Sequence, residues 1–499
     1  MAEGQIGVNM GKMYDGEIYE KVSQWFDGHR EEMTEDIKRL VRIPSISDPD
    51  AEQGPFGQGC RDALDEMLAM GRKYGFHTEN REYYVGSIGV ENQDWGNTIG
   101  LWNHLDVVPL GEGWDYEPFE PVVKDGYLIG RGAQDNKGPA VAMLYVMRCI
   151  RELGLPAAHE LCLFAGCDEE RGMSDLEYYT SKYPLPALSM IADCGFPVCY
   201  GEKGILEGTA VSGRAFSDEV LELYGGSAGN IIPDRAVLVV GKRTEVSEGQ
   251  LAALQTSLPE CVKAEARDGK IRVTAYGTSR HSAFPEGSVN AVHELSAAMC
   301  GAKLLEEGDR KLLQFIADAT SDYYGEHIGI SYSDEVSGRL TCAGTVLRLQ
   351  GHQAQLQFNI RYSITADAGK LEAGLEEYCG RGGYKWELIR NSAPNYFPKD
   401  RKEVGLLTDL FNEITGCTAE PYVMGGGTYA RKLPNAFGYG IGSMPEREGD
   451  MAGVLFRKGH GGAHEPDEGL DLEKLLSAAK IYTMAMLALN ECDFNREEA

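Results

Sequence analysis

Five short segments of the sequence carry histidines and carboxylates of the types that bind divalent metals. They are residues 103–109 with His104 and Asp106, 130–139 with Asp135, 167–172 with Glu169 and Glu170, 191–195 with Asp193, and 459–468 with His460 and His464. Mixed imidazole and carboxylate ligands suit Zn²⁺, Mn²⁺ or Co²⁺. Taken together and in this order, the segments predict a metal centre, which none of them would predict alone.

The surroundings of these residues favour that interpretation over structural alternatives. His104 and Asp106 are two residues apart after an apolar run, so their side chains point to one side of an extended chain. A carboxylate beside a histidine commonly orients a metal-ligating imidazole. The acids at 168–170 also follow an apolar run, and adjacent like charges repel one another unless a cation or solvent relieves them. The alternatives are a structural His–Asp pair, a glycine turn with a helix cap, and a solvated charged loop.

Strands and helices alternate at both ends of the chain. Apolar spacing predicts helices at 17–42, 62–74, 138–153, 403–415 and 472–489, and buried strands at 98–108, 159–166 and 188–192. This alternation predicts an α/β fold whose central, mainly parallel sheet has helices on both faces. Open α/β sheets bind ligands at the carboxyl ends of their strands, and nearly all of the candidate segments follow predicted strands.

The middle of the chain has a different pattern. Alternating segments at 236–240, 271–276 and 355–363 predict antiparallel strands, and the spacing over 288–305 predicts a helix. We therefore expect an inserted α+β domain at 202–392. It would interrupt an α/β domain made of residues 1–201 and 393–499.

Charge and cysteine usage limit the partners and the compartment. Lys and Arg total 48 and Asp and Glu total 77, for a net charge of -29. A surface of this sign repels phosphate backbones and anionic lipid, so we expect neither nucleic acid nor a membrane as a partner. The first residues lack a basic segment followed by an apolar core, which predicts no secretory signal. Twelve cysteines without CxxC pairs predict reduced thiols in a cytoplasmic protein.

The five segments in this order resemble the M20 family of metallopeptidases, and within it the PepV-like dipeptidases. The resemblance extends from His104 to His464 and includes the insertion. It implies a catalytic domain interrupted by a lid domain, and a two-metal peptidase that hydrolyses dipeptides or other small peptides. Two metal ions can together activate a water and stabilise the oxyanion that forms.

The resemblance also implies a role for each candidate residue. One ion would be held by His104, Asp135 and Asp193, and the other by Asp135, Glu170 and His464. Asp106 would orient His104, and Glu169 would be the general base. The ions would be zinc, with manganese or cobalt as alternatives. His464 is preferred over His460 because the residues after it fit the family's ending. A cis peptide bond between Asp135 and Asn136 is expected as well.

Three further residues are implied to contact the substrate. His281, in the segment 277–283, would polarise the scissile carbonyl, and Asn230 would contact the substrate. Arg431 follows three glycines at 425–427 and would bind the substrate carboxylate, because arginine binds carboxylates through two parallel hydrogen bonds. This predicts a requirement for a free C-terminal carboxylate. The long insertion resembles lids that serve their own chain, which predicts a competent monomer.

Three other functions remain open on the sequence. Residues 225–229 fit the GxSxG pattern of a serine hydrolase with Ser227 as nucleophile, but that motif needs a helix directly after the serine and Pro233 follows closely. An M20-type amidohydrolase or deacylase acting on N-acyl amino acids would use the same metal site. A non-catalytic peptide-binding protein is disfavoured because Glu169 and all five candidate ligands are present.

Overall fold

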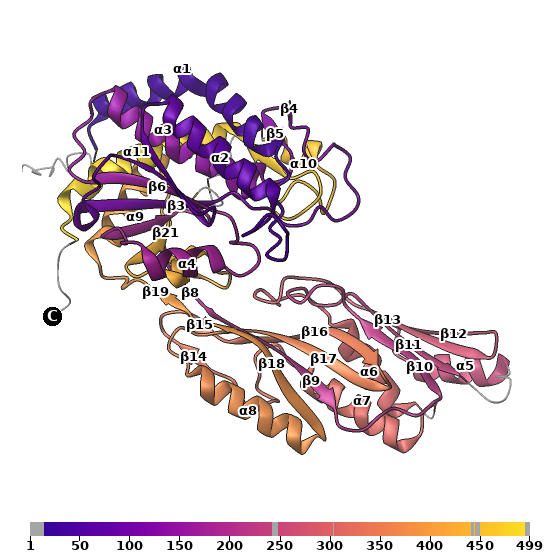
Figure 1. Cartoon of the computed structure of the whole chain (residues 1–499). Helices are drawn as coiled ribbons and strands as arrows, with labels where there is room; N and C mark the ends of the chain where they lie inside the picture. The colour runs from indigo at the N-terminus through magenta and orange to yellow at the C-terminus, as the bar shows by residue number, and fades with distance from the viewer. Residues whose placement is uncertain (1–13, 242–247, 303, 441–443, 445–449, 495–499) are drawn as a thin grey trace, which may run out of the picture. The chain divides into compact units, whose positions relative to one another are not determined.

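The chain folds into two compact units. The structure, a computed structural model, describes residues 14–241, 248–302, 304–440, 444 and 450–494. The first unit takes the described residues of Met1–Gly201, Tyr396–Tyr422 and Thr428–Ala499, and the second unit those of Glu202–Asn395 and Val423–Gly427 (Figure 1). The insertion therefore begins after Gly201, and a short piece of the later chain, Val423–Gly427, also belongs to it.

The first unit contains helices and short strands from both ends of the chain. Its helices are α1 (Gly16–Val41), α2 (Gln58–Lys73), η1 (Trp95–Asn97), η2 (Ala133–Lys137), α3 (Gly138–Glu152), α4 (Ser174–Lys182), α9 (Lys402–Thr415), η3 (Tyr429–Lys432), α10 (Ala452–Leu455), α11 (Leu472–Ala488) and η4 (Leu489–Glu491). Its strands are β1 (His77–Arg81), β2 (Val85–Gly89), β3 (Thr98–His104), β4 (Val122–Lys124), β5 (Tyr127–Ile129), β6 (Glu160–Gly166), β7 (Leu188–Ile191), β21 (Ala436–Gly438) and β22 (Gly469–Asp471). Strands β8 (Cys199–Glu202), β19 (Asn395–Tyr396) and β20 (Tyr422–Met424) lie where the chain passes between the units.

The main sheet of this unit is parallel at its centre and antiparallel at its edges. The strand order is β1-β2-β6-β3-β7-β21-β8-β19, and the pairs from β6 to β21 are parallel. The outer pairs β1-β2, β2-β6 and β21-β8 are antiparallel. The predicted α/β fold class is thus confirmed. Because β3, β6 and β7 run in the same direction, the residues that follow them meet at one edge of the sheet.

Helices cover both faces of this sheet (Figure 1). Helices α1, α2, α3 and α11 lie on one side, and α4 lies on the other side with η3. On the α4 side Trp102 stacks on Phe164 with ring centroids 4.0 Å apart, and the ring of Tyr429 contacts Trp102 edge-on. Burial of these large aromatic rings anchors η3, the short helix that carries Arg431, against the sheet.

Two elements are clearly shorter than expected from the sequence. The strand predicted at 98–108 ends at His104, because the backbone then leaves the sheet and Val107 forms a bridge with Ile46. The helix predicted at 288–305 is shorter: α6 (Ala291–Gly301) begins after Asn290, whose side chain caps it by accepting a hydrogen bond from the backbone of Val292. Apolar periodicity did not reveal either end, since a local pairing and a cap decide them.

The second unit is built on an antiparallel sheet. Its strands are β9 (Gly204–Ser212), β10 (Val220–Gly225), β11 (Arg235–Gly241), β12 (Val262–Arg267), β13 (Lys270–Tyr276), β14 (Ser333–Asp334), β15 (Gly338–Arg339), β16 (Thr341–Gln350), β17 (Gln353–Tyr362) and β18 (Tyr384–Ser392). Its helices are α5 (Glu248–Ser257), α6, α7 (Glu307–Ala319) and α8 (Ala368–Arg381). Eight of the strands form one sheet in the order β12-β13-β11-β10-β16-β17-β9-β18.

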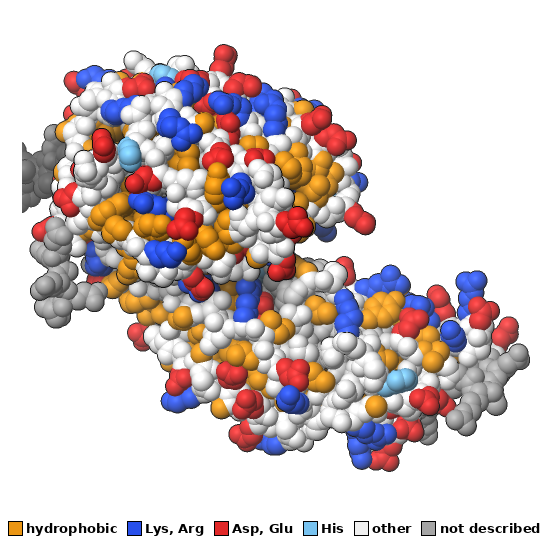
Figure 2. Space-filling view, viewed as in Figure 1, with side chains coloured by type: hydrophobic (Ala, Val, Ile, Leu, Met, Phe, Trp, Pro, Cys, Tyr) orange, Lys and Arg blue, Asp and Glu red, His pale blue; other side chains and the backbone are white. Residues whose placement is uncertain are grey.

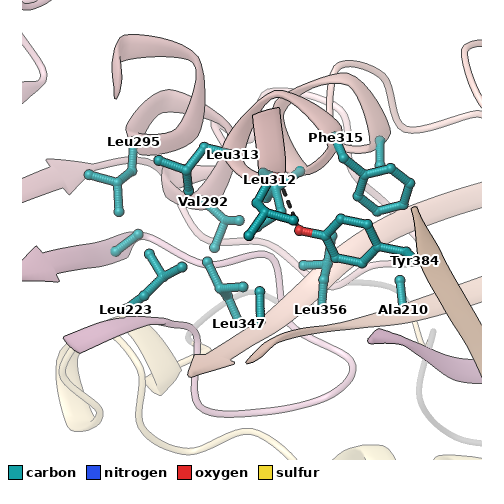
Figure 3. Packing of buried hydrophobic residues seen from close by; sticks show 14 of the residues in the cluster. Ala210, Leu223, Val292, Leu295, Leu312, Leu313, Phe315, Leu347, Leu356 and Tyr384 are labelled. Atoms are coloured by element: carbon teal, nitrogen blue, oxygen red, sulfur yellow. Dashed lines mark hydrogen bonds between the residues drawn. The ribbon is translucent and has the colours of Figure 1, made fainter. Parts of the chain in front are cut away.

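The core of the second unit lies between this sheet and its helices. Figure 3 shows Leu295 and Leu312 from α6 and α7 packed over Leu223, Leu347 and Leu356 of the strands. The Tyr384 hydroxyl donates to the backbone oxygen of Leu312 at 3.0 Å, which satisfies a polar group inside this core.

The surface of the chain is charged and mixed in sign. On the face drawn in Figure 2, acidic and basic side chains are interspersed over both units. Among the described residues, no helix is both long enough and apolar enough to cross a membrane. All twelve cysteines lie in the described part of the chain, and each is a free thiol there.

Candidate active site

The predicted ligands come together at the carboxyl edge of the parallel strands. His104 is the last residue of β3, Glu170 follows the end of β6 by four residues, and Asp193 follows the end of β7 by two. His104 and Gly166 are register partners in the β3-β6 pair, so the segment after β6 begins beside the histidine. Parallel pairing of three strands therefore positions ligands that are far apart in the sequence.

Asp135 lies between the two predicted histidine ligands. Its Oδ1 is 2.9 Å from His104 Nε2, and its Oδ2 is 3.1 Å from His464 Nε2. His464 Nε2 is also 2.9 Å from Glu170 Oε1, and His104 Nε2 is 3.8 Å from Asp193 Oδ2. One carboxylate thus presents an oxygen to each histidine, which is the arrangement expected of a ligand that bridges two ions.

Asp106 contacts the site in more than one way. His104 Nδ1 is 3.0 Å from the backbone oxygen of Asp106 and 3.5 Å from its carboxylate Oδ1. The two carboxylate oxygens instead accept the backbone N–H groups of Glu169 at 3.1 Å and Glu170 at 3.0 Å. The backbone of Asp106 therefore contacts the imidazole most closely, while its side chain holds the segment that carries the two glutamates.

The protonation states of this cluster depend on burial and on its close carboxylates. Burial raises the pKa of Glu169, with further contributions from neighbouring acids. Burial by itself would raise the pKa of Asp135, but hydrogen bonds from His104 and His464 hold it well below its usual range. Hydrogen bonds to Asp135 and Glu170 raise the pKa of His464 to about 11. The cluster therefore favours positive charge at its centre.

The donor set fits two divalent cations. His104, Asp135 and Glu170 form one group of ligand atoms, and His104, Glu169 and Asp193 another; within each group the atoms lie within 4.8 Å of one another. Among the described residues, Glu169 Oε1 is a buried atom without a hydrogen-bond partner. Buried oxygens and imidazole nitrogens that converge in this way are stabilised by cations, since deprotonated carboxylates and neutral histidines are what metals bind.

The loop that carries Asp135 has an unusual backbone. The peptide bond between Asp135 and Asn136 is cis, as expected from the family resemblance. Asn136 Nδ2 donates to the backbone oxygen of Ala192 at 3.1 Å and to Asp193 Oδ1 at 3.2 Å. Gly132 has a φ of +81°, and a Cβ there would lie 2.6 Å from a methyl group of Val107. A larger residue at this position would displace the loop.

The structure distinguishes between the two histidines near the C-terminus. His464 Nε2 faces Asp135 and Glu170, as described above. His460 Nδ1 lies 2.5 Å from Asp467 Oδ2, and Asp467 Oδ1 accepts the backbone N–H of Asp115 at 2.8 Å. His460 thus belongs to a separate, partly buried pair with Asp467, and His464 stays the predicted ligand.

Two buried acids that the sequence did not single out contact the backbone of the site. Asp175 Oδ2 accepts the backbone N–H of Cys167 at 2.7 Å and of Asp168 at 3.0 Å, and it also accepts the Tyr429 hydroxyl. It therefore links the segment before Glu169 to the helix that carries Arg431. Glu468 contacts the loop of Asp135 in a similar way. Asp175 has no sequence signal, and Glu468 lies in the segment 459–468 without a pattern that predicts its burial, since acids are usually solvated.

The predicted substrate-contacting residues are divided between the units. Arg431 is half-buried in η3 of the first unit. Asn230 and His281 belong to the second unit, where the backbone oxygen of Asn230 accepts the N–H of Ser282 at 2.9 Å and Ile231 forms a bridge with His281. His281 Nδ1 accepts the backbone N–H of Ala283 at 3.1 Å. Gly425 lies against Ala283, because a Cβ at Gly425 would be 2.7 Å from the Ala283 methyl group.

Ser227 does not occupy a nucleophile elbow. It lies in a turn after β10, and the chain continues through residues 231–234 into β11, with no helix between these two described strands. A nucleophile elbow requires a strand, a sharp turn and a helix in direct succession. The serine hydrolase alternative therefore lacks its structural basis.

Comparison with known proteins identifies the family of the chain. Residues 100–488 match the model of a family described as peptidase family M20/M25/M40. The chain belongs to this family. The prediction that it is a peptidase of the M20 type is thereby confirmed.

The similarity between this M20 peptidase and its relatives extends over nearly its whole length. It is 29% identical over 475 residues to "Putative dipeptidase YtjP" of Bacillus subtilis (strain 168), covering 92% of this chain and 97% of that protein. Among solved structures, human carnosine dipeptidase 1 gives a TM-score of 0.57 at 14% identity, covering 95% of this chain and 99% of that one. The dipeptidase Dug1p of Saccharomyces cerevisiae gives 0.56 at 16% identity, with 95% and 98% covered. Because these sequence identities are low, the similarity to the two solved structures concerns the fold alone.

Proposed function

We propose that this M20 peptidase hydrolyses dipeptides that carry a free C-terminal carboxylate, using two divalent metal ions. The observation that carries the proposal is the position of Asp135, whose two oxygens face His104 and His464 at 2.9 and 3.1 Å. The name of the Bacillus relative supports a dipeptide as the substrate. The proposed ligands are His104, Asp135 and Asp193 for one ion and Asp135, Glu170 and His464 for the other.

Within this proposal Glu169 carries the proton of the reaction. When bound, two divalent cations would polarise the scissile carbonyl and lower the pKa of the attacking water. Glu169 takes the proton of that water and passes it to the leaving amine. Its burial raises its pKa, which favours a carboxyl group that accepts and then returns a proton. Its backbone is held by the Asp106 carboxylate, so the base has a defined position.

The remaining roles concern the substrate. His281 Nδ1 accepts a hydrogen bond from the Ala283 backbone, so a neutral imidazole there carries its proton on Nε2. That N–H would donate to the scissile carbonyl oxygen as negative charge develops on it. Asn230 would contact the peptide beside it. Arg431 would bind the C-terminal carboxylate, which selects short substrates because the cleaved bond must lie close to the anchored end.

Finer features of the proposal concern the metal, the compartment and the assembly. Zinc is the proposed ion, with manganese or cobalt as alternatives, because imidazole and carboxylate ligands accept all three. The twelve free thiols, eight of them buried, support a cytoplasmic location. We propose that a monomer is competent and that neither nucleic acid nor a membrane takes part.

Hydrolysis by chelated and reloaded protein tests this function. The protein is stripped with a chelator and reloaded with Zn²⁺, Mn²⁺ or Co²⁺. It is then assayed on dipeptides, on tripeptides and on N-acetyl amino acids. We expect activity to return only with metal, and to be highest on dipeptides. Faster cleavage of N-acetyl amino acids would favour the deacylase alternative, and metal-independent cleavage would contradict the two-metal site.

A further inference from the structure

Glu468 is a buried acid whose carboxylate is saturated with hydrogen bonds from the loop that carries Asp135. The residue is 1% exposed. Its Oε1 accepts the backbone N–H of Gln134 at 2.8 Å and of Asp135 at 3.0 Å. Its Oε2 accepts the backbone N–H of Gly132 at 2.9 Å and Nη1 of Arg131 at 2.8 Å. The two oxygens thus accept four hydrogen bonds from positions 131, 132, 134 and 135 of one loop.

The ion pair of Glu468 and Arg131 also contacts the segment that carries His464. Arg131 Nη2 is 3.4 Å from the backbone oxygen of His464 and 3.3 Å from that of Leu110. The backbone oxygen of Glu468 accepts the N–H of Gly130 at 2.9 Å. The buried ion pair of Arg131 and Glu468 therefore contacts the loop of Asp135 and the segment of His464, whose side chains meet at the proposed second ion.

A carboxylate suits this position better than any other side chain. It offers about four acceptor sites and no donor, which matches the four donors that surround it. Glutamine would offer one oxygen and one NH₂ group. The NH₂ group would then face two of the donors of the loop and could accept from neither. Leaving buried donors unsatisfied is destabilising, because their hydrogen bonds to water are lost without replacement.

We propose that Glu468 is a positioning residue that fixes the backbone of 132–135, so that Asp135 presents one oxygen toward His104 and the other toward His464, with which it would hold the two ions. Through Arg131 it keeps this loop in register with the segment of His464. The inference rests on the proposed two-metal function, which assigns no role to Glu468. It predicts that metal affinity depends on a side chain that contacts neither metal nor substrate.

Titration of metal-free Glu468→Gln with Co²⁺ tests the proposal. The full chain is used, and both binding and the visible absorption of bound Co²⁺ are followed, since the absorption reports ligand geometry. We expect the affinity for Co²⁺ to fall about 10–100-fold, as is usual for groups that orient ligands. We also expect the absorption spectrum of the bound ions to change, which a loss of global stability alone would not cause.

Asp36→Asn provides the matched control. Asp36 is also a buried acid of the first unit, 2% exposed on α1, and it accepts the hydroxyl groups of Tyr74 and Tyr145. In the described part of the chain its contacts are with these tyrosines and with Arg39 and Lys73, not with the proposed ligands. Its amide variant should lower the melting temperature while leaving Co²⁺ stoichiometry, affinity and spectrum unchanged.

Glu468→Asp keeps the proposal testable if the glutamine variant does not fold. Aspartate preserves the charge opposite Arg131 but is shorter by one methylene group, so the oxygens withdraw from the loop. We expect a folded protein with weakened Co²⁺ binding. The role of Glu468 would be overturned if the unmutated protein binds two ions and the folded Glu468 variants keep its affinity and spectrum. If only Glu468→Asp folds, an unchanged result for that variant is sufficient. Fewer than two ions in the unmutated protein would instead contradict the proposed function.

Discussion

The side-chain oxygen Oδ2 of Asp106 accepts the backbone N–H of Glu170 at 3.0 Å, although the sequence suggested Asp106 only as the partner of His104. The neighbouring oxygen accepts the backbone N–H of Glu169 at 3.1 Å. Asp106 thus connects the strand that carries the first histidine to the segment that carries the proposed base and a proposed ligand. Contacts of this kind, from acids to backbone N–H groups, recur at Asp175 and Glu468. In each case a buried carboxylate holds the backbone of a segment that carries, or lies next to, a proposed ligand.

Replacement of Asp135 should remove both ions. In Asp135→Ala neither histidine keeps the carboxylate oxygen that faces it, so each ion loses a ligand. We expect metal analysis of the purified variant to show a large loss of both equivalents, whereas Asp193→Ala should mainly affect one. An Asp135→Ala protein with one equivalent at full occupancy would contradict a shared bridge.

Replacement of Glu169 should affect catalysis, whereas replacement of Glu170 should affect metal binding. Glu169→Ala should keep its metals and lose about 10²–10⁴-fold in kcat, the usual contribution of a general base. Glu170→Ala should lose metal, because Glu170 Oε1 lies 2.9 Å from His464 Nε2. The measurements are metal content and kcat under saturating metal. Equal metal loss in both variants would show that the two roles are exchanged.

Metal binding should release protons near neutral pH. Hydrogen bonds to Asp135 and Glu170 raise the pKa of His464 to about 11, so its imidazole is protonated at pH 7 when no metal is present. A ligand must be neutral, and the proton therefore competes with the ion below that pKa. Affinity should rise as the pH rises. Calorimetry in buffers of different ionisation enthalpy measures the released protons, and His464→Gln should release about one fewer. Binding enthalpies that do not depend on the buffer would contradict a protonated His464 in the metal-free protein.

The carboxylate anchor predicts a specific response to amidated substrates. Amidation of a dipeptide's C-terminus removes the charge that Arg431 would bind through two parallel hydrogen bonds, so kcat/KM should fall strongly in the unmutated enzyme. Arg431→Ala should be slow on both forms and no longer distinguish between them. Lys432→Ala is the control, since Lys432 pairs with the exposed Glu177 on the surface. Equal rates on free and amidated dipeptides in the unmutated enzyme would reject the anchor.

The sequence alone determined which residue types are present and where strands and helices alternate. His104, Glu169, Glu170 and Asp193 were recognisable because they follow apolar runs. Asp135 and His464 lie in glycine-rich segments, and the order of all six residues resembles one peptidase family. The α/β class followed from periodicity, since apolar spacing reflects which face of an element is buried. Element ends were less predictable: β3 stops at His104 because a bridge between Val107 and Ile46 draws the chain away.

Only the tertiary structure decided how those residues are held. The loop folded around Asp467 pairs this acid with His460, and the structure brings His464 rather than His460 against Asp135 and Glu170. The role of Glu468 depends on hydrogen bonds between residues more than three hundred positions apart in the chain. Such contacts form where the fold brings backbone N–H groups together in a buried place, and an isolated glutamate in a sequence carries no sign of them.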